Sequence, residues 1–313
     1  MQIQPVRAAV AGLMISGLGT VAVAAPSFHS PLSKAVKAIQ ADVDESEQPY
    51  QWALPSFIQA GPVFKEVSLS LGDTYAGFKG RKFNIKQGQA TIGINSRLQL
   101  FYGEQYFLAK GRSSSSRLDV ADSYYGIRGV VKPPTEKDPT SLSLQFQAIR
   151  PDTASTVVAN NGALFDGTHN NVFSVNYLDG HKNQLQVQYT SITETGGLSA
   201  NVYTFGIGHD YQLSEFLRAR VQGQLVSESF TGNGVSSNFE LRPIFLGALA
   251  INPAPWLSIE ADGTIMPSGV PLAGGEFTAI SGLYLNNPGG VIDDIRKDFV
   301  AFASLRLLFH GKF

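Results

Sequence analysis

The sequence has no cysteine, little charge and no long apolar run beyond its amino terminus. Without cysteine there is no disulfide bond, no thiolate metal site and no lipid-attachment site. The formal net charge of -1 gives no reason to expect nucleic acid or another polyanion as a partner. The longest later apolar run, at 244–251, is far shorter than the ~20 residues that a membrane-spanning helix needs. Any further crossing of a membrane must therefore use strands.

The amino terminus has the features of a secretion signal. Arg7 supplies a positive charge, an apolar run follows at 8–21, and residues 22–24 (Ala-Val-Ala) form a small-residue cleavage site. Cleavage after Ala24 is preferred to cleavage one residue later, which would place Pro26 directly after the cut. An uncleaved anchor is the alternative, but the apolar run is shorter than the ~20 residues of a spanning helix. Residues 1–24 are therefore predicted to be a signal peptide.

Much of the remaining sequence alternates between apolar and polar residues, which is the period of a β-strand. The alternation is nearly perfect at 91–102, 141–148 and 184–191. The 32 glycines, 20 phenylalanines and 11 tyrosines suit a sheet with many turns and aromatic anchors. Further candidate strands lie at 66–78, 104–110, 123–131, 173–177, 203–207, 217–225, 239–251, 257–265, 276–285 and 299–313.

The last candidate strand has one apolar face and one polar face, and it ends in an aromatic residue. Phe299, Leu307 and Phe309 share the apolar face, whereas Arg306 lies on the other. Behind a secretion signal, such a strand resembles the terminal strand of bacterial outer-membrane β-barrel proteins. The resemblance implies that Phe309 and Phe313 form a membrane-assembly signal for the barrel assembly machinery. It also implies a location in the cell outer membrane, in contact with its lipid.

The fold class that follows is an all-β, transmembrane antiparallel up-and-down β-barrel at residues 65–313. The sequence offers thirteen candidate strands, but single-chain bacterial barrels have even numbers. We expect twelve strands, with ten or fourteen as alternatives, and one error among the weaker candidates or near 275–298. A soluble sandwich would show the same alternation. The signal, the aromatic end and the near absence of charge on the apolar faces favour the barrel.

Residues 25–64 have a different pattern and are predicted to form a short periplasmic N-terminal arm. Leu32, Val36 and Ile39 are spaced as on one face of a short amphipathic helix, and an acidic run follows at 42–47. The interpretation we favour is a solvated leader. The alternative is a plug or lid that folds into the barrel lumen from the periplasmic side.

The polar strand faces point into the lumen of such a barrel, and they are rich in glutamine and arginine. Glutamine amides can hydrate a pore or bind sugars and other neutral polar solutes. Arginines outnumber carboxylates on these faces, which adds a mild preference for anionic solutes. The alternative is a closed interior in which these groups bond one another. The predicted pore-lining residues are Arg97, Gln99, Gln145, Gln147, Gln184, Gln186, Gln188, Arg218, Arg220, Gln222, Gln224, Glu240, Arg242, Glu260, Asp262 and Arg306.

These faces predict an outer-membrane channel, or porin-like passive transporter, for small polar or anionic solutes. The alternative is a closed structural, assembly or adhesion barrel that acts through its loops or its arm. A barrel-borne lipid hydrolase would need a serine or an aspartate beside a histidine. The best pair, His209 and Asp210, abuts a turn, and neighbouring strand residues face opposite sides. The acidic run at 42–47 lacks the glycine of a calcium loop. We therefore predict no enzyme activity, no catalytic residue, no metal site and no cofactor.

Overall fold

The chain forms a sheet of twelve antiparallel strands. The computed structural model describes residues 50, 52–53, 58–61, 63–78, 81–110, 117–151, 169–179, 182–193, 199–232, 235–271 and 298–312. No helix in this part of the chain has the length and apolar character needed to cross a membrane. The strands are β1 (Glu66–Phe78), β2 (Arg81–Asn95), β3 (Leu98–Lys110), β4 (Arg117–Lys132), β5 (Ser141–Pro151), β6 (His169–Asp179), β7 (Asn183–Thr193), β8 (Ser199–Gln212), β9 (Leu217–Gly232), β10 (Val235–Ala254), β11 (Leu257–Met266) and β12 (Val300–Lys312).

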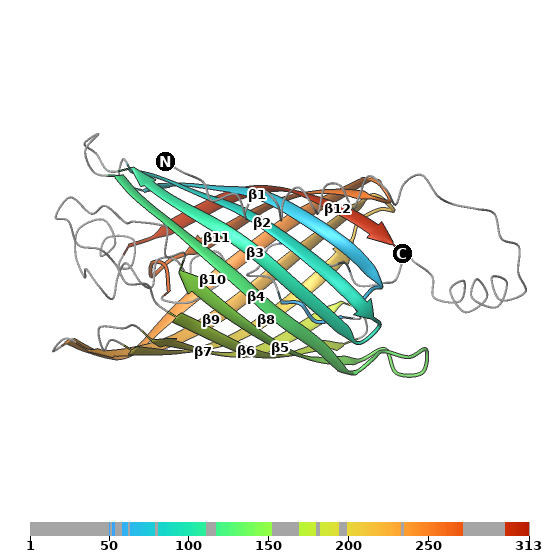
Figure 1. Cartoon of the computed structure of the whole chain (residues 1–313), viewed down its shortest axis with the longest axis horizontal. Coiled ribbons are helices and arrows are strands. Elements are labelled where there is room, and N and C mark those ends of the chain that lie inside the picture. Colours follow the sequence, from blue (N-terminus) through green and yellow to red (C-terminus); the bar gives the residue numbers. More distant parts are fainter. Residues whose placement is uncertain are drawn as a thin grey trace, which may run out of the picture. The chain divides into compact units, whose positions relative to one another are not determined.

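The sheet closes on itself as a barrel (Figure 1). Each strand pairs with its neighbours in sequence, and β1 pairs antiparallel with β12 in a register that sets Leu69 opposite Phe309. Closure provides every strand with a partner on both sides, which a sheet in lipid requires because hydrocarbon offers its edges no hydrogen bonds. The predicted fold class, an antiparallel barrel of twelve strands, is confirmed.

The two rims of the barrel differ in the length of their connections. At one end, here called the short-turn rim, β1 begins and β12 ends, at the right of Figure 1. At the other end, the long-loop rim, residues 152–168 separate β5 from β6 and residues 267–299 separate β11 from β12. The connections at the short-turn rim are residues 96–97, 133–140, 180–182, 213–216 and 255–256.

The last strand runs toward the short-turn rim because β11 pairs directly with β12. Counting residues 276–285 as a further strand of the sheet would have reversed this direction, and the barrel order leaves no place for it between β11 and β12. That segment itself lies outside the described residues. The predicted signal peptide at 1–24, the arm up to residue 49 and Phe313 of the predicted assembly signal also lie outside them.

The prediction of a single strand at 91–102 is wrong, because this stretch is a hairpin. β2 ends at Asn95 and β3 begins at Leu98. The register shifts between Gly93 and Asn95, where a β-bulge adds one residue to β2. The extra residue keeps even-numbered side chains outward on both strands, so Ile94 and Leu100 are both exposed. The alternation therefore continues through the turn as though the chain did not reverse.

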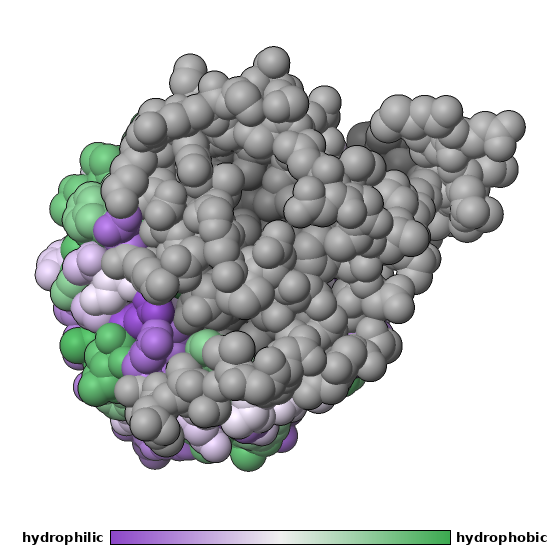
Figure 2. Space-filling view, turned by 90° about the vertical axis from the view of Figure 1, so that its left-hand side faces the viewer, coloured by the Kyte–Doolittle hydropathy of each residue, from purple (hydrophilic) through white to green (hydrophobic). Residues whose placement is uncertain are grey.

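The outward face of the barrel is apolar. Val187, Phe205 and Leu241 are each more than half exposed on it. The ring of Trp256 at the short-turn rim stacks on that of Phe309, with centroids 6.5 Å apart, and interfacial aromatic residues of this kind are frequent in membrane barrels. Figure 2, which looks onto the long-loop rim, shows hydrophobic residues along the outer margin of the described part. A surface of this kind suits contact with lipid, since in water it would drive aggregation.

Gly93 provides the space through which the chain enters the barrel before β1. A Cβ placed on Gly93 would lie 1.7 Å from the backbone oxygen of Phe64 and 2.9 Å from its carbonyl carbon. That oxygen also accepts a hydrogen bond from the backbone N–H of Glu66 over 2.9 Å, at the start of β1. Backbone atoms held in this way cannot rotate aside. Any side chain at position 93 must therefore displace the entering chain.

We expect Gly93→Ala to destabilise the protein by about 1–3 kcal/mol, the usual cost of overpacking a close contact. Gly129→Ala is the matched control, because a Cβ there meets no atom within 4 Å. Urea unfolding of both variants in detergent, followed by the loss of compact migration on a gel, measures the difference. Equal midpoints for the two variants would contradict this account.

Candidate functional site

The inward faces of the strands carry most of the polar side chains that the sequence assigns to the lumen. Exposure alternates along β7, β8 and β11, so each strand has one outer face and one inner face. That the inner side chains line a conducting path stays a prediction. The buried ones are Gln99, Gln184, Gln186, Arg220, Gln222, Arg242, Glu260, Asp262 and Arg306, and the half-buried ones are Gln145, Gln147, Gln188, Arg218, Gln224 and Glu240.

Arg97 is the exception among the predicted residues. It lies in the exposed turn between β2 and β3 and not on the lumen wall. Its backbone N–H donates to Asn95 Oδ1 over 2.8 Å, and its carbonyl accepts from the N–H of Val130 over 2.7 Å. The prediction failed because it treated the hairpin as one strand, in which every odd-numbered residue points inward.

Several charged residues of the inner wall were missed by the sequence analysis, among them Asp210, Glu228 and Arg128. All three point inward, and the last two are at most 1% exposed. The signal for all three is the alternation itself. It needed to be extended along β8 past Ile207 and along β9 past Leu225, and to be applied to the inward face of the candidate strand at 123–131, which contains Arg128. Asp210 was assigned to a turn, which begins after β8 ends at Gln212.

The end of the N-terminal arm lies inside the barrel. Residues 50–64, here called the inserted segment, belong to the same compact unit as the strands. The backbone N–H of Ile58 donates to Gln222 Oε1 over 3.0 Å, and the carbonyl of Gln59 accepts from the Ser143 hydroxyl over 3.3 Å. The carbonyl of Gly61 accepts from the Arg128 guanidinium. The described residues of the segment thus contact the inner wall, as in the plug alternative and unlike the solvated leader that we favoured, and that they close the lumen stays a prediction.

Apolar contacts also hold the inserted segment. Ile58, which is 1% exposed, packs in a buried cluster with Ala60 and Leu178, the last of which comes from β6. A Cβ placed on Gly206 of β8 would lie 3.2 Å from the Cδ1 atom of Ile58, so the small residue at this position makes room for the segment. The segment is therefore packed into the lumen as a part of the core.

Asp210 and Arg220 form the most extensive charged contact beside the segment. The guanidinium donates to both carboxylate oxygens, with Nε–Oδ1 and Nη2–Oδ2 distances of 2.6 and 2.7 Å. Arg220 also donates to the carbonyl oxygen of Ile58 over 2.9 Å, and Gln184 donates to Asp210 Oδ2 over 2.7 Å. Trp52 donates to Asp210 Oδ1 over 3.1 Å, and its ring lies 5.4 Å from the Arg220 guanidinium carbon. Neutral groups of the segment thus provide hydrogen bonds to both charges of this pair.

Glu260 is a second point of attachment for the segment. The Tyr50 hydroxyl donates to Glu260 Oε1 over 2.9 Å, and the backbone N–H of Ala53 lies 3.1 and 3.0 Å from the two carboxylate oxygens. Burial raises the pKa of Tyr50 well above its ordinary value, and the charge of Glu260 raises it further. The phenol therefore stays protonated as a donor. The Tyr50 ring also contacts Arg218, whose guanidinium carbon lies 5.8 Å from the ring centre.

The remaining arginines of β10 and β12 are paired with carboxylates. Arg306 bonds Asp262, and both side chains are at most 2% exposed. Arg242 bonds Glu228 and Glu240. With the Arg220–Asp210 pair included, each buried arginine on the inner faces of β8 to β12 has a carboxylate partner.

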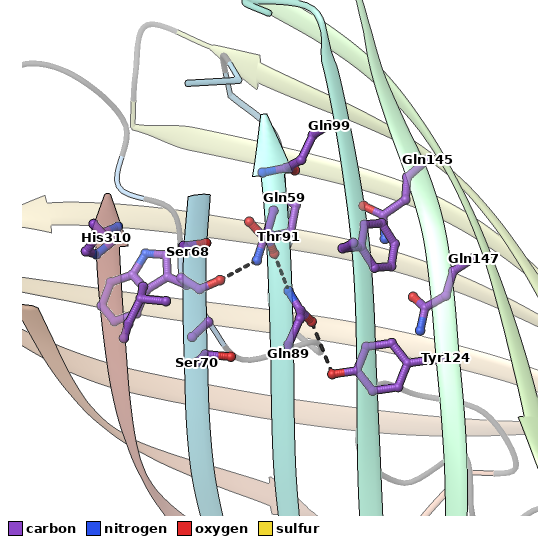
Figure 3. A pocket seen from close by; sticks show the side chains of 14 residues that line it. Gln59, Ser68, Ser70, Gln89, Thr91, Gln99, Tyr124, Gln145, Gln147 and His310 are labelled. Atoms are coloured by element: carbon purple, nitrogen blue, oxygen red, sulfur yellow. Dashed lines mark hydrogen bonds between the residues drawn. The ribbon is translucent and has the colours of Figure 1, made fainter. Parts of the chain in front are cut away.

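A cavity with an empty volume of about 660 Å³, which includes space open to solvent, lies beside the inserted segment. Gln145 and Gln147 reach it from β5, His310 reaches it from β12, and Gln59 reaches it from the segment (Figure 3). Among the described residues that line it, none is an aspartate, glutamate, lysine or arginine. The cavity is thus bounded by amides, hydroxyls and aromatic rings.

The described part of the chain holds no metal-binding cluster, and one serine–histidine contact lies on its inner wall, where Ser258 Oγ is 3.1 Å from His310 Nε2 and His310 Nδ1 is 3.7 Å from Glu66 Oε1. Three or more histidine, aspartate or glutamate side chains do not come together there in a way that could hold a metal ion. The half-buried His209 bonds Asn183, with an Nδ1–Oδ1 distance of 2.6 Å, while its neighbour Asp210 bonds Arg220 inside the barrel. The two residues therefore lie on opposite faces, as the strand period predicts.

We expect Asp210→Asn to destabilise the protein by about 3–5 kcal/mol, because it leaves the Arg220 guanidinium buried without its counter-charge. Asp138→Asn is the matched control, since Asp138 pairs with Lys132 over 2.5 Å where both side chains are about half exposed. The bonds from Lys132 and Thr140 lower the pKa of Asp138 to about 2, so this pair is charged at pH 7. Urea unfolding at pH 7 should show a large loss for the first variant and none that is resolvable for the second. Equal losses would refute the role given to Asp210.

Comparisons with known proteins identify the fold. No protein-family model matches the sequence, and no curated protein is significantly similar to it. Among solved structures, an outer-membrane channel from Pseudomonas putida F1 is similar with a TM-score of 0.52 and 8% identity, over 84% of this chain and 100% of that one. The NanC porin has a TM-score of 0.49 and 7% identity, over 77% and 98% of the two chains. OmpT of Vibrio cholerae has a TM-score of 0.39 and 10% identity, over 79% and 97%.

At 8% identity, the similarity to the Pseudomonas channel is one of fold. It agrees with the closed sheet, the apolar outer face and the polar inner face described above. The chain therefore has the fold of the bacterial outer-membrane β-barrels.

Proposed function

We propose that the protein is an outer-membrane channel for small, uncharged polar solutes. The observation that carries the proposal is the cavity in the lumen, which is bounded by amides, hydroxyls and aromatic rings within a barrel of apolar exterior. Such a lining offers donors and acceptors to a solute without the cost of desolvating a charge. In this arrangement the short-turn rim faces the periplasm and the long-loop rim faces the exterior.

The arrangement of charge favours neutral solutes over anionic ones. The sequence suggested a preference for anions because arginines outnumber carboxylates on the predicted lumen faces. In the folded chain, Arg220, Arg242 and Arg306 are engaged by carboxylates, and Arg128 donates to a carbonyl of the inserted segment. A guanidinium that is already bonded in this way attracts a passing anion less than a free one would.

A closed structural or assembly barrel is the second candidate function, and the inserted segment favours it. The segment joins β4, β5, β9 and β11 through hydrogen bonds, so it obstructs part of the lumen near the short-turn rim. A barrel closed in this way would act through its rims. A lipid hydrolase remains the weakest proposal, because His209 and Asp210 lie on opposite faces and the contact of Ser258 with His310 is part-buried on the inner wall, away from the lipid-facing surface.

The proposed location predicts that the protein fractionates with the outer membrane. It should migrate as a compact species on a gel when unheated and as a slower species after boiling, because closed barrels resist detergent until heated. Mature protein found dissolved in buffer without detergent, as a monomer, would exclude a membrane location.

The channel hypothesis predicts stepwise conductance when the purified full chain is inserted into a planar bilayer. Trp52→Ala should raise the open-state conductance or its frequency, because it removes the bond to Asp210 and the ring contact with Arg220 that hold the segment. Trp256→Ala is the matched control, since the second of the chain's two tryptophans lies on the exposed outer side. Silence from the wild type and from the Trp52 variant would favour the closed barrel.

A further inference from the structure

The inserted segment divides the lumen into two unlike sides. Its attachments to Asp210, Arg220, Gln222 and Glu260 lie on β8, β9 and β11, where the paired charges are concentrated. The cavity lies against β1, β2, β3 and β5, with contributions from β4 and β12. The segment also bonds Arg128 of β4 and Ser143 of β5, but the described residues that line the cavity itself include no aspartate, glutamate, lysine or arginine.

Four polar side chains that face the cavity have unused hydrogen-bonding capacity. Gln145 and Gln147 on β5 and Ser68 and Ser70 on β1 make no side-chain hydrogen bond within the part of the chain that the structure describes. Figure 3 shows both glutamine amides directed into the cavity without a partner. Alternate residues of a strand are about 7 Å apart, so the two amides present spaced donors and acceptors along one wall.

Tyr124, Gln89 and Thr91, which also line the cavity, are linked by hydrogen bonds. The Tyr124 hydroxyl donates to Gln89 Oε1 over 3.1 Å, and Gln89 Nε2 donates to the Thr91 hydroxyl over 3.1 Å (Figure 3). The Tyr124 ring covers Gly103, where a Cβ would lie 2.3 Å from a ring carbon. These bonds use the polar atoms of the group, so its contribution to the cavity is a fixed aromatic surface.

Aromatic surface and free amides together select a class of ligand. Trp52, Phe101 and Tyr124 line the cavity, and because Trp52 and Tyr124 are each only 3% exposed, the half-buried ring of Phe101 offers most of the apolar surface that suits the C–H face of a sugar ring. The amides and hydroxyls suit the ring hydroxyls, which both donate and accept. The described lining residues include no aspartate, glutamate, lysine or arginine, and the imidazole of His310 already lies 3.7 Å from Glu66, so the desolvation of a charged group would be poorly compensated.

We propose that this cavity is a binding site for a neutral sugar, held by Gln145, Gln147, Ser68 and Ser70 and stacked on the aromatic surface beside the inserted segment. The inference rests on the proposed function in that the site lies on the route through the lumen. It deepens that function by naming the solute class and by giving the inserted segment a part in the site through Trp52 and Gln59.

The chain contains a natural reporter of this site. Trp52 lines the cavity, and the other tryptophan, Trp256, lies at the outer surface. In the full-length Trp256→Phe variant, fluorescence reports on Trp52 alone. We expect glucose and maltose to change this fluorescence saturably. Glucuronate and glucosamine, which carry a negative and a positive charge, should bind at least about tenfold more weakly because of their desolvation cost.

Substitutions on two separate strands test the contacts. In the Trp256→Phe background, joint replacement Gln145→Leu and Gln147→Leu should weaken binding of the better sugar about tenfold. Joint replacement Ser68→Ala and Ser70→Ala should weaken it about fivefold. Gln188→Leu is the matched control, because this inward glutamine does not line the cavity, and it should leave binding unchanged. Compact migration of each unheated variant shows that it has folded, and the serine pair supplies a second test if the glutamine pair does not fold.

The outcomes separate this proposal from the channel hypothesis. Absence of any saturable response to the neutral sugars, equal binding of the charged ones, or insensitivity to both pairs of substitutions would overturn the sugar site. Ion conductance in potassium chloride, measured on the same protein, tests the channel independently. Conductance without sugar binding refutes the site alone, whereas sugar binding without conductance supports the site and refutes the channel.

Discussion

Backbone hydrogen bonding is the constraint on which the rest of this structure depends. A sheet that faces lipid must pair every N–H and C=O group within itself, because hydrocarbon supplies no partner. The pairing of β1 with β12 meets this requirement by closing the barrel. Closure separates an outer face, which carries residues such as Phe205 and Leu241, from an inner face that carries the polar side chains. The polar character of the lumen therefore follows from the closure of the sheet between β1 and β12.

The inserted segment changes what that inner face can do. Buried arginines and carboxylates on a barrel wall need counter-charges and hydrogen bonds, and the segment provides some of these through Trp52, Ala53 and the carbonyl of Ile58. In turn, the wall anchors a stretch of chain that contains little regular structure of its own. The result is a lumen whose charged side is compensated and whose uncharged side, around Gln145 and Gln147, remains open.

The limits of prediction from sequence are clearest at the β2–β3 hairpin. The alternation of Ile92, Ile94, Leu98 and Leu100 continues without a break, although the chain reverses at residues 96–97. A periodic pattern shows which face of the sheet a side chain occupies. The bulge between Gly93 and Asn95 keeps the alternation in phase across the turn, so the turn leaves no break in the pattern. The same rule, extended two or three residues further along β8 and β9, would have found Asp210 and Glu228.

The sequence by itself determined the fold class and the sidedness of nearly every predicted lumen residue, because a period of two is a local property of the chain, and it indicated the number of strands only with the rule that such barrels have even numbers. Only the tertiary structure decided that the described residues of the inserted segment lie against the inner wall, which arginines are paired with carboxylates and which glutamines of the described part stay unpaired. These features depend on contacts such as Ala53 with Glu260, separated by 207 positions in the chain. No local pattern encodes such a contact, since it exists only once the barrel has closed around the segment.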